Sequence, residues 1–245
     1  MAKLKAQELV QFVNNEIVEF HNKKLNRIKL VKLRQVLRKK NPYLFRAKNI
    51  LVASDLVQDI LEAYLYASEE EFFGKLLEHV AIFIAKKVNN GRKSTATGID
   101  LEFDKDNVTY LVSVKSGPNW GNASQHKKQI QDFNTAIKVL KQSDKSIKVQ
   151  TVLGICYGKI KDTHEHGHLR TMGQNFWYLL SGNKNLYTDI IEPLGHEAKK
   201  HNDDFKSQKA QVINLFTDEF MKSFCDNGAI NWKKLVEFNS GNFSD

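Results

Sequence analysis

The sequence is poor in the residues that mark small secreted or disordered chains. Its 245 residues include two cysteines, three prolines and 13 glycines. The cysteines, Cys156 and Cys225, are too few for a disulfide framework and lack the spacing of a zinc site. Low proline and glycine content excludes a collagen-like chain and argues against disorder. No apolar run is long enough to cross a membrane and none follows the first residues, so the sequence predicts a cytoplasmic protein with no membrane partner.

Hydrophobic residues form 41% of the chain, which is enough to build a packed core. Basic residues outnumber acidic ones by 37 to 28, and the resulting formal charge of +9 suggests a polyanionic partner. Ribosomal and membrane-surface proteins share such an excess. Because no repeat or linker stands out, we predict a single domain over residues 1–245. It would consist of a helical N-terminal part (about 1–66), a core (about 69–195) and a helical C-terminal part (about 196–245).

Apolar residues at helical spacing predict a series of helices. These helices are expected at residues 4–20, 22–40, 54–66, 68–88, 124–142 and 205–224. A β-branched strand is expected at 147–157, beside the strand that ends in Lys115. The segment 22–40 is rich in lysine and arginine. Its basic face either contacts phosphate groups or is solvated, and the sequence does not choose between the two. Asn41 and Pro42 then end this helix, because a residue before proline disfavours the helical conformation.

Two further strand segments, residues 97–103 and 110–117, predict a β-hairpin. The polar residues Asp104–Asn107 between them are typical of a turn. We expect Phe103 to pair with Val108 across a four-residue loop; a two-residue loop at Lys105-Asp106 is the alternative. Both loops contain an even number of residues, so both place the same side chains on each face of the hairpin.

Four polar side chains then share one face of this hairpin. Asp100 and Glu102 project from the first strand, and Ser113 and Lys115 project from the second. Neighbouring carboxylates repel unless a cation lies between them, and Mg²⁺ binds one or two carboxylates together with phosphate oxygens and water. A lysine beside the metal can orient or help deprotonate water and stabilise a phosphorane-like transition state. The arrangement indicates phosphodiester hydrolysis, the alternative being a solvated hairpin with ordinary surface charges.

Four short strings carry a resemblance to a known family: GIDLEF, VSVKSGPNWGN, GICYGK and GQNFWYLLSG, between about Gly98 and Leu194. An aspartate on one strand and x-V-K on the next resembles the PD-(D/E)XK nuclease superfamily. The string that follows the lysine resembles one group of type II restriction endonucleases. This resemblance implies an α/β fold with a restriction-endonuclease-like core, a central mixed β-sheet flanked by helices, and additional N- and C-terminal helices. It also implies Mg²⁺-dependent, sequence-specific cleavage of double-stranded DNA by a homodimer, with a cognate DNA methyltransferase in the same system.

The same resemblance implies roles for individual residues. Asp100 would be the main metal ligand, the backbone carbonyl of Val114 would face the metal, and Lys115 would position or activate water. The family usually carries an acid two residues before the lysine, but this chain has Ser113 there. A serine cannot supply a charged metal ligand, so the second acid must come from another position.

Three acids are candidates for that role. Glu102 is the nearest, two residues from Asp100 and on the same face. Glu78 and Asp132 lie on the predicted helices 68–88 and 124–142. In the family, a glutamate on the helix before the hairpin often approaches the metal, which makes Glu78 a catalytic candidate; an exposed Glu78 paired with a nearby lysine is the alternative.

Polar residues around the hairpin are predicted to contact DNA. The loop Ser116–Asn122 contains a proline and two glycines, so it is expected to have a defined shape near the scissile phosphate. Trp120 would pack on the sugar-phosphate backbone or the next helix, or else fill the core. The predicted DNA contacts are Arg92, Lys93, Ser116, Asn119, Trp120, Asn122, Gln125, Lys128 and Arg170.

The segment His164–His168 alternates histidine with other residues, a spacing that is compatible with a zinc site. Because no fourth ligand lies nearby in the sequence, we favour a polar loop that faces DNA. Two other functions are compatible with the residues. One is a repair or junction-resolving nuclease on the same fold; the other, suggested by Ser113, is a DNA-binding module without catalysis.

Overall fold

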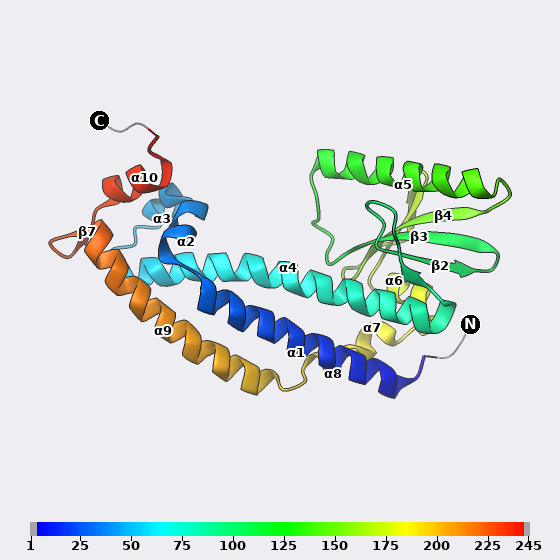
Figure 1. Cartoon of the computed structure of the whole chain (residues 1–245), viewed down its shortest axis with the longest axis horizontal. Coiled ribbons are helices and arrows are strands. Elements are labelled where there is room, and N and C mark those ends of the chain that lie inside the picture. Colours follow the sequence, from blue (N-terminus) through cyan, green and yellow to red (C-terminus); the bar gives the residue numbers. More distant parts are fainter. Residues whose placement is uncertain (1–3, 243–245) are drawn as a thin grey trace. The chain divides into compact units, whose positions relative to one another are not determined.

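The computed structural model describes residues 4–242, which fall into two compact units (Figure 1). The first, called the α/β unit, comprises the chain up to Ile17 together with Phe73–His196. The second, called the helical unit, comprises Val18–Phe72 and the chain from Glu197 onward. Helices α1 (Ala6–Leu30) and α4 (Ala53–Asn89) contribute residues to both units. A single nuclease domain over the whole chain stays a prediction.

A six-stranded mixed β-sheet forms the centre of the α/β unit (Figure 1). Its strand order is β1-β2-β3-β4-β6-β5, in which β3 and β4, and also β4 and β6, are parallel, while the other neighbours are antiparallel. The sheet confirms the predicted fold class and the predicted place of the strand 147–157 beside the lysine strand. The strands are β1 (Arg92–Lys93), β2 (Leu101–Lys105), β3 (Val108–Lys115), β4 (Val149–Ile155), β5 (Thr163–Glu165) and β6 (His168–Met172).

Helices cover both faces of this sheet, with α4 and α5 on opposite sides (Figure 1). On one face, Phe133 of α5 (Ala123–Ser143) packs against Leu111 of β3. On the other face, Phe176 of α6 (Gln174–Ser181) lies so close to Gly154 of β4 that a Cβ atom there would overlap its ring. The short helices α7 (Leu186–Asp189) and α8 (Ile191–Leu194) follow. Side chains that share a face with Leu111, such as Ser113, therefore point toward α5.

The β2–β3 hairpin closes with the two-residue turn Asp106-Asn107. Lys105 pairs with Val108, and the two turn residues have φ angles of 53° and 60°. Aspartate and asparagine tolerate this left-handed conformation, and such a turn matches the twist of the strands. The predicted pairing of Phe103 with Val108 is therefore wrong. The observed loop still has an even number of residues, so the predicted distribution of side chains between the two faces is confirmed.

Two predicted breaks between helices are absent. The sequence predicts separate helices at residues 4–20 and 22–40, but α1 continues through this boundary and ends at Leu30, before the short helix α2 (Leu33–Lys39). It also predicts a helix start at Ser68, but the Ser68 hydroxyl donates to the Tyr64 carbonyl (3.3 Å) within α4. A serine that bonds back to the preceding turn does not cap a new helix.

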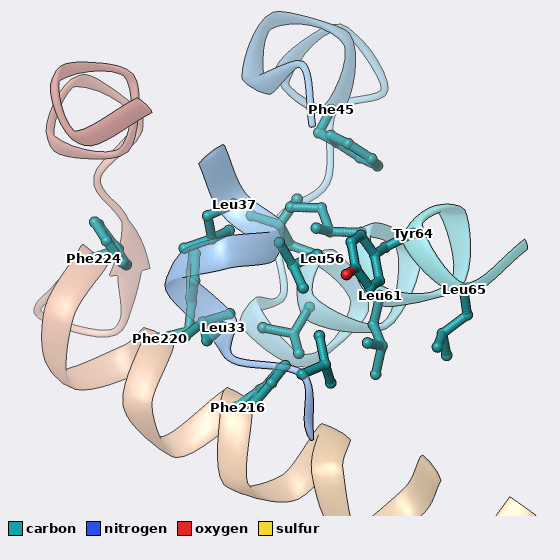
Figure 2. Packing of buried hydrophobic residues seen from close by; sticks show 14 of the residues in the cluster. Leu33, Leu37, Phe45, Leu56, Leu61, Tyr64, Leu65, Phe216, Phe220 and Phe224 are labelled. Atoms are coloured by element: carbon teal, nitrogen blue, oxygen red, sulfur yellow. The ribbon is translucent and has the colours of Figure 1, made fainter. Parts of the chain in front are cut away.

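The helical unit is organised around one apolar cluster (Figure 2). This cluster joins α2, the first half of α4 and helix α9 (Ala198–Phe224), which begins earlier than predicted. The short helix α3 (Pro42–Ala47) packs Phe45 into it and begins where Asn41 caps the first turn. Members drawn in Figure 2 include Leu33, Leu37, Leu56, Leu61, Tyr64, Phe216 and Phe220.

The last part of the helical unit contains elements that the sequence reasoning missed. Strands β7 (Cys225–Asp226) and β8 (Ala229–Ile230) pair around Asn227-Gly228, and helix α10 (Trp232–Ser240) follows. Asn-Gly is a strong hairpin signal, so this turn was visible in the sequence. Within residues 4–242, no helix has both the length and the apolar character that a membrane span requires.

Candidate active site

Asp100 lies where β2 separates from β3. Its backbone N–H still donates to the Val112 carbonyl (2.9 Å), one position before β2 begins. Its carboxylate oxygen Oδ2 then accepts the backbone N–H of Val114 (2.6 Å), in the place of a backbone carbonyl. A side-chain acceptor therefore replaces one backbone hydrogen bond between β2 and β3 and fixes the carboxylate at the end of this strand pair.

The carbonyl of Val114 faces the same end of the β2–β3 pair. Successive residues of a strand direct their backbone groups to opposite neighbours. Val112 and Val114 are directed toward β2, whereas the Lys115 carbonyl accepts the Cys156 N–H (2.9 Å) on the other side. The predicted ligands Asp100 and Val114 thus present a carboxylate and a carbonyl oxygen to one place.

Glu78, on helix α4, is the second acid near this end of the strand pair. Burial raises the pKa of its carboxyl, and the negative charge of Asp100 raises that pKa further. The positive charges of Lys93, His79 and Lys115 oppose this rise, and the Lys93 Nζ lies 3.9 Å from the Glu78 carboxylate. Asp100 and Lys115 therefore lie near enough to Glu78 for their charges to shift its pKa, and Glu78 forms an ion pair with Lys93.

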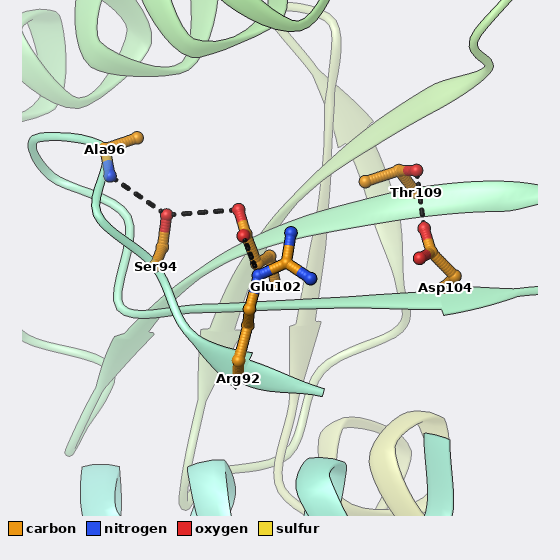
Figure 3. A network of polar contacts seen from close by, with 6 residues as sticks. All are labelled: Arg92, Ser94, Ala96, Glu102, Asp104 and Thr109. Carbon is orange, nitrogen blue, oxygen red and sulfur yellow. Dashed lines mark hydrogen bonds and ion pairs between the residues drawn. The ribbon is translucent and has the colours of Figure 1, made fainter. Parts of the chain in front are cut away.

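Glu102 makes different contacts (Figure 3). It shares a face with Asp100, as predicted, but its carboxylate accepts a hydrogen bond from Arg92 Nε (2.6 Å) and one from the Ser94 hydroxyl (3.3 Å). Ser94 in turn accepts the N–H of Ala96 (3.1 Å), which ties this network to the segment between β1 and β2. Two predicted site residues, Glu102 and the DNA contact Arg92, are thus paired with each other.

Ser113 is closed off from solvent, with 0% of its surface exposed. Its hydroxyl lies 3.0 Å from Gln129 Oε1 and 3.3 Å from Asp100 Oδ2, and the Gln129 amide donates to the Gly98 carbonyl (3.2 Å). One hydroxyl proton serves two acceptors, so Ser113 links the carboxylate to helix α5. The sequence reasoning missed Gln129. Its signal was a polar residue at an inward position of the predicted helix, four residues before Phe133.

Asp132, the third candidate acid, does not join this group. A Cβ atom at Gly98 would overlap the Asp132 carboxylate, and Gly98 has a φ of 75°, which favours glycine. Asp132 also forms an ion pair with Lys128 (3.1 Å), one of the predicted DNA contacts. Gly98 therefore allows α5 to approach the start of β2, next to Asp100.

The loop Ser116–Asn122 folds back over the lysine. Lys115 Nζ lies 5.1 Å from the centre of the Trp120 ring, which packs on an apolar cluster around Leu153. A Cβ atom at Gly117 would overlap the Tyr157 hydroxyl, which explains the glycine after Ser116. Trp120 contacts both the core and the lysine, and a defined loop near the scissile phosphate stays a prediction.

Two predicted DNA contacts have a structural role at the end of this loop. Asn122 Oδ1 accepts the N–H of Gln125 (3.1 Å), and Gln125 Oε1 accepts the N–H of Asn122 (2.8 Å), which is a capping box for α5. Among the described residues, the NH₂ groups of both side chains make no hydrogen bond. Asn119 is exposed. DNA contact by these residues stays a prediction.

The segment His164–His168 is a hairpin, so the predicted loop is wrong. Glu165 pairs with His168, and the turn His166-Gly167 has φ angles of 50° and 83°. Throughout residues 4–242, no group of three or more His, Cys, Asp or Glu side chains is placed to hold a metal ion. The three histidines of this hairpin are therefore not grouped as the ligands of one metal ion.

The family model described as Type II restriction endonuclease EcoO109I matches residues 7–202, which is more than half of the chain. A search of curated proteins found no match. The matched residues include Glu78, Asp100 and Lys115.

Proposed function

Because the chain belongs to the type II restriction endonuclease EcoO109I family, we propose that it hydrolyses phosphodiester bonds in double-stranded DNA at a specific sequence, with Mg²⁺ as cofactor. The observation that supports this proposal is the Asp100 carboxylate, which accepts the Val114 N–H (2.6 Å) where β2 and β3 separate, together with Asp100 and Lys115 lying near enough to Glu78 to shift its pKa. Two nearby carboxylates with one raised pKa favour a divalent cation between them.

The donor set fits Mg²⁺. Asp100 has one carboxylate oxygen not engaged by Val114, and Glu78 supplies a second carboxylate. We assign the cation to these two residues and the Val114 carbonyl, with water and DNA oxygens as its other ligands. When bound, Mg²⁺ would neutralise charge on the phosphate and acidify a bound water molecule.

The side chains of the protein have separate tasks in this proposal. Lys115 donates hydrogen bonds to the attacked phosphate and the attacking water, and the Trp120 ring limits the positions of its ammonium group. Ser113 and Gln129 hold the Asp100 carboxylate in its orientation. Glu102 stabilises the β1–β2 edge through Arg92 and is not a ligand.

We also propose that the protein acts as a homodimer, because a two-fold dimer presents two sites to the two strands of a palindromic target. A cognate DNA methyltransferase would protect the host DNA, and the enzyme would act in the cytoplasm. These statements rest on the family resemblance.

Incubation with long duplex DNA, with and without Mg²⁺, tests the proposed function. Discrete fragments that form only with Mg²⁺ support it. Nicking that depends on DNA structure would instead identify a repair or junction-resolving nuclease. Binding without cutting would identify a DNA-binding module without catalysis.

The choice of second acid is tested with Glu78→Gln and Glu102→Gln. We expect Glu78→Gln to weaken Mg²⁺ binding in calorimetric titration and to slow cleavage roughly 100-fold, because it removes a ligand charge. Glu102→Gln should change Mg²⁺ binding little. The opposite result, a weak effect at Glu78 and a strong one at Glu102, would move the ligand to β2.

A further inference from the structure

A cavity of about 350 Å³ lies beside the proposed active site in the α/β unit. We call it the histidine cavity. Its walls come from the loop after β3, from the first turns of α5 and from the β5–β6 hairpin. The residues that matter are Trp120, His126, Glu165, His166, His168 and Arg170.

Two residues of the cavity wall, His168 and Arg170, each have a buried side-chain nitrogen without a hydrogen-bond partner among the described residues. His168 is 7% exposed, and its Nδ1 is enclosed without a hydrogen-bond partner among the described residues. An unpaired acceptor costs less than an unpaired donor, which places the ring proton on Nε2. Nε2 makes no hydrogen bond within the described residues either. Arg170 Nε is likewise buried without a partner.

The hydrogen-bond donors of the lining favour an anion. Arg170 is always cationic, His126 and His166 each supply a ring N–H donor, and Glu165 is the one acid among the described residues of the wall. The Glu165 carboxylate already accepts a hydrogen bond from the Thr163 hydroxyl (2.9 Å). Burial lowers the pKa of His168, and the charges of His166, Arg170 and His126 lower it further against the opposing effect of Glu165. A bound anion would raise the pKa of His168 instead.

The cavity is close to the proposed catalytic lysine. Ser113 pairs with Leu153 and Leu153 with Arg170, so these three residues form a row across the sheet. Strands lie about 4.8 Å apart, which places Arg170 roughly 10 Å from Ser113. Trp120 lines the cavity, and the Lys115 Nζ lies 5.1 Å from the centre of the Trp120 ring. A group bound in the cavity is therefore one side chain away from Lys115.

We propose that the histidine cavity binds a backbone phosphate of the cut DNA strand, close to the scissile one. Arg170 and the Nε2–H of His168 donate to its oxygens, and His126 and His166 supply further N–H donors. A recessed, donor-rich site suits a phosphate oxygen better than a base edge, because stacked bases are read by side chains that project into a groove. The proposal rests on the proposed function, since it takes duplex DNA as the ligand.

The first test measures binding to a duplex of arbitrary sequence, without Mg²⁺, at several salt concentrations. Arg170→Gln should lower the affinity roughly 10- to 100-fold and reduce the salt slope by about one. His168→Phe, which keeps the ring that packs on Phe133, should also weaken binding. Arg170→Lys should restore part of the affinity. His164→Phe, on the same hairpin but outside the cavity, is the matched control and should bind as the wild type does.

The second test uses the duplex that the enzyme cuts, with one phosphate at a time replaced by a neutral methylphosphonate. We expect one position near the cleaved bond to lower wild-type affinity and to have no effect in Arg170→Gln. An unchanged interference pattern in Arg170→Gln and His168→Phe overturns the proposal, and so does sensitivity to base changes in place of phosphate changes.

These outcomes are separable from failure of the proposed function. If the cavity variants lose DNA affinity and salt dependence but the wild type cleaves no DNA, the phosphate site is supported and the proposed nuclease activity is rejected. Cleavage with cavity variants that bind as the wild type does would reject the cavity alone. Failure to bind any duplex would reject both. Melting temperatures near that of the wild type show that each variant is folded.

Discussion

The two units of this protein use charged side chains in different ways. In the helical unit, basic side chains lie over aromatic rings: Arg34 and Arg38 are each 5.2 Å from the centre of the Phe238 ring. In the α/β unit, Asp100 and Lys115 lie at the same end of the β2–β3 strand pair, and the Asp100 carboxylate accepts the Val114 N–H. The arginines of the helical unit pack on a ring that is not part of the proposed active site, whereas Lys115 of the α/β unit packs on the Trp120 ring and belongs to that site. A basic sequence therefore does not locate a DNA-binding surface by itself.

Glycine is distributed just as unequally. All but two of the 13 glycines belong to the α/β unit, and the segment Val18–Phe72 contains none. Gly98 lets Asp132 approach the backbone, and Gly117 makes room for the Tyr157 hydroxyl. The α/β unit positions its site by close backbone contacts, and the helical unit relies on the volume of its apolar side chains.

The largest expected effect separates function from stability in the α/β unit. Asp100→Asn and Lys115→Ala should each slow cleavage roughly 10³-fold or more, because they remove the proposed metal ligand and the cation beside it. Asparagine can still accept the Val114 N–H, so thermal melting should change little. Arg38→Ala in the helical unit is the opposite control: it should lower the melting temperature and leave cleavage normal. Near wild-type cutting by either active-site variant would show that the site is elsewhere.

The next effect tests whether position 113 is open to a metal. Ser113→Asp would bury a carboxylate against Gln129 Oε1 and Asp100, and should destabilise the protein by roughly 3 kcal/mol while slowing cleavage. Ser113→Ala should cost only about 1 kcal/mol. Denaturant unfolding and cleavage rates measure both. Faster cleavage by Ser113→Asp would mean that this position ligates the metal and would sink the packing role given to Ser113.

In the helical unit, the pH dependence of stability offers a further test. Burial lowers the pKa of His21 to about 4, and the charges of His201 and Lys24 contribute. The His21 and His201 rings stack with centres 4.3 Å apart, Phe20 lies edge-on to His21, and His201 is 3.8 Å from Glu197. Because folding disfavours protonated His21, its contribution is complete above pH 6.5 and is lost as pH falls toward 4.

Melting curves between pH 7 and pH 4 measure this loss. We expect it to be on the order of 1 kcal/mol after solvent screening and to become smaller in His21→Gln. An equally steep pH dependence in the variant would assign the effect to other groups.

The smallest effect distinguishes two asparagines of the loop after Lys115. Asn122→Ala removes the cap of α5 and should cost about 1 kcal/mol, which lowers the melting temperature by roughly 2–4 °C. Asn119→Ala should leave the melting temperature unchanged, since its side chain is exposed. DNA affinity measured on both variants then tests contact separately. A larger loss of stability at Asn119 than at Asn122 would contradict the capping assignment.

Strand periodicity was sufficient to predict the face shared by Asp100, Ser113 and Lys115. It was not sufficient to predict partners. Glu102 was the nearest acid in sequence, but in the structure its carboxylate pairs with Arg92 of β1. This partner was missed because a strand of two residues cannot be recognised from the sequence. Gln129 was missed because an inward polar residue on a helix was not matched to the serine that it contacts.

Helix boundaries failed for a related reason. Ser68 is a good capping residue in isolation, but the long helix α4 uses its hydroxyl within the preceding turn. His21 likewise lies within α1, where its ring stacks on His201, a residue far away in the sequence. Local capping signals lose to packing contacts that only the folded chain reveals.

The bond between the Val114 N–H and the Asp100 carboxylate makes one amide a reporter of one side chain. Amides elsewhere in the ladder are protected from hydrogen exchange by neighbouring backbone. The Val114 amide is protected only while the carboxylate stays in place. Any ligand that draws Asp100 away should therefore speed the exchange of this amide and leave its neighbours on β3 unchanged.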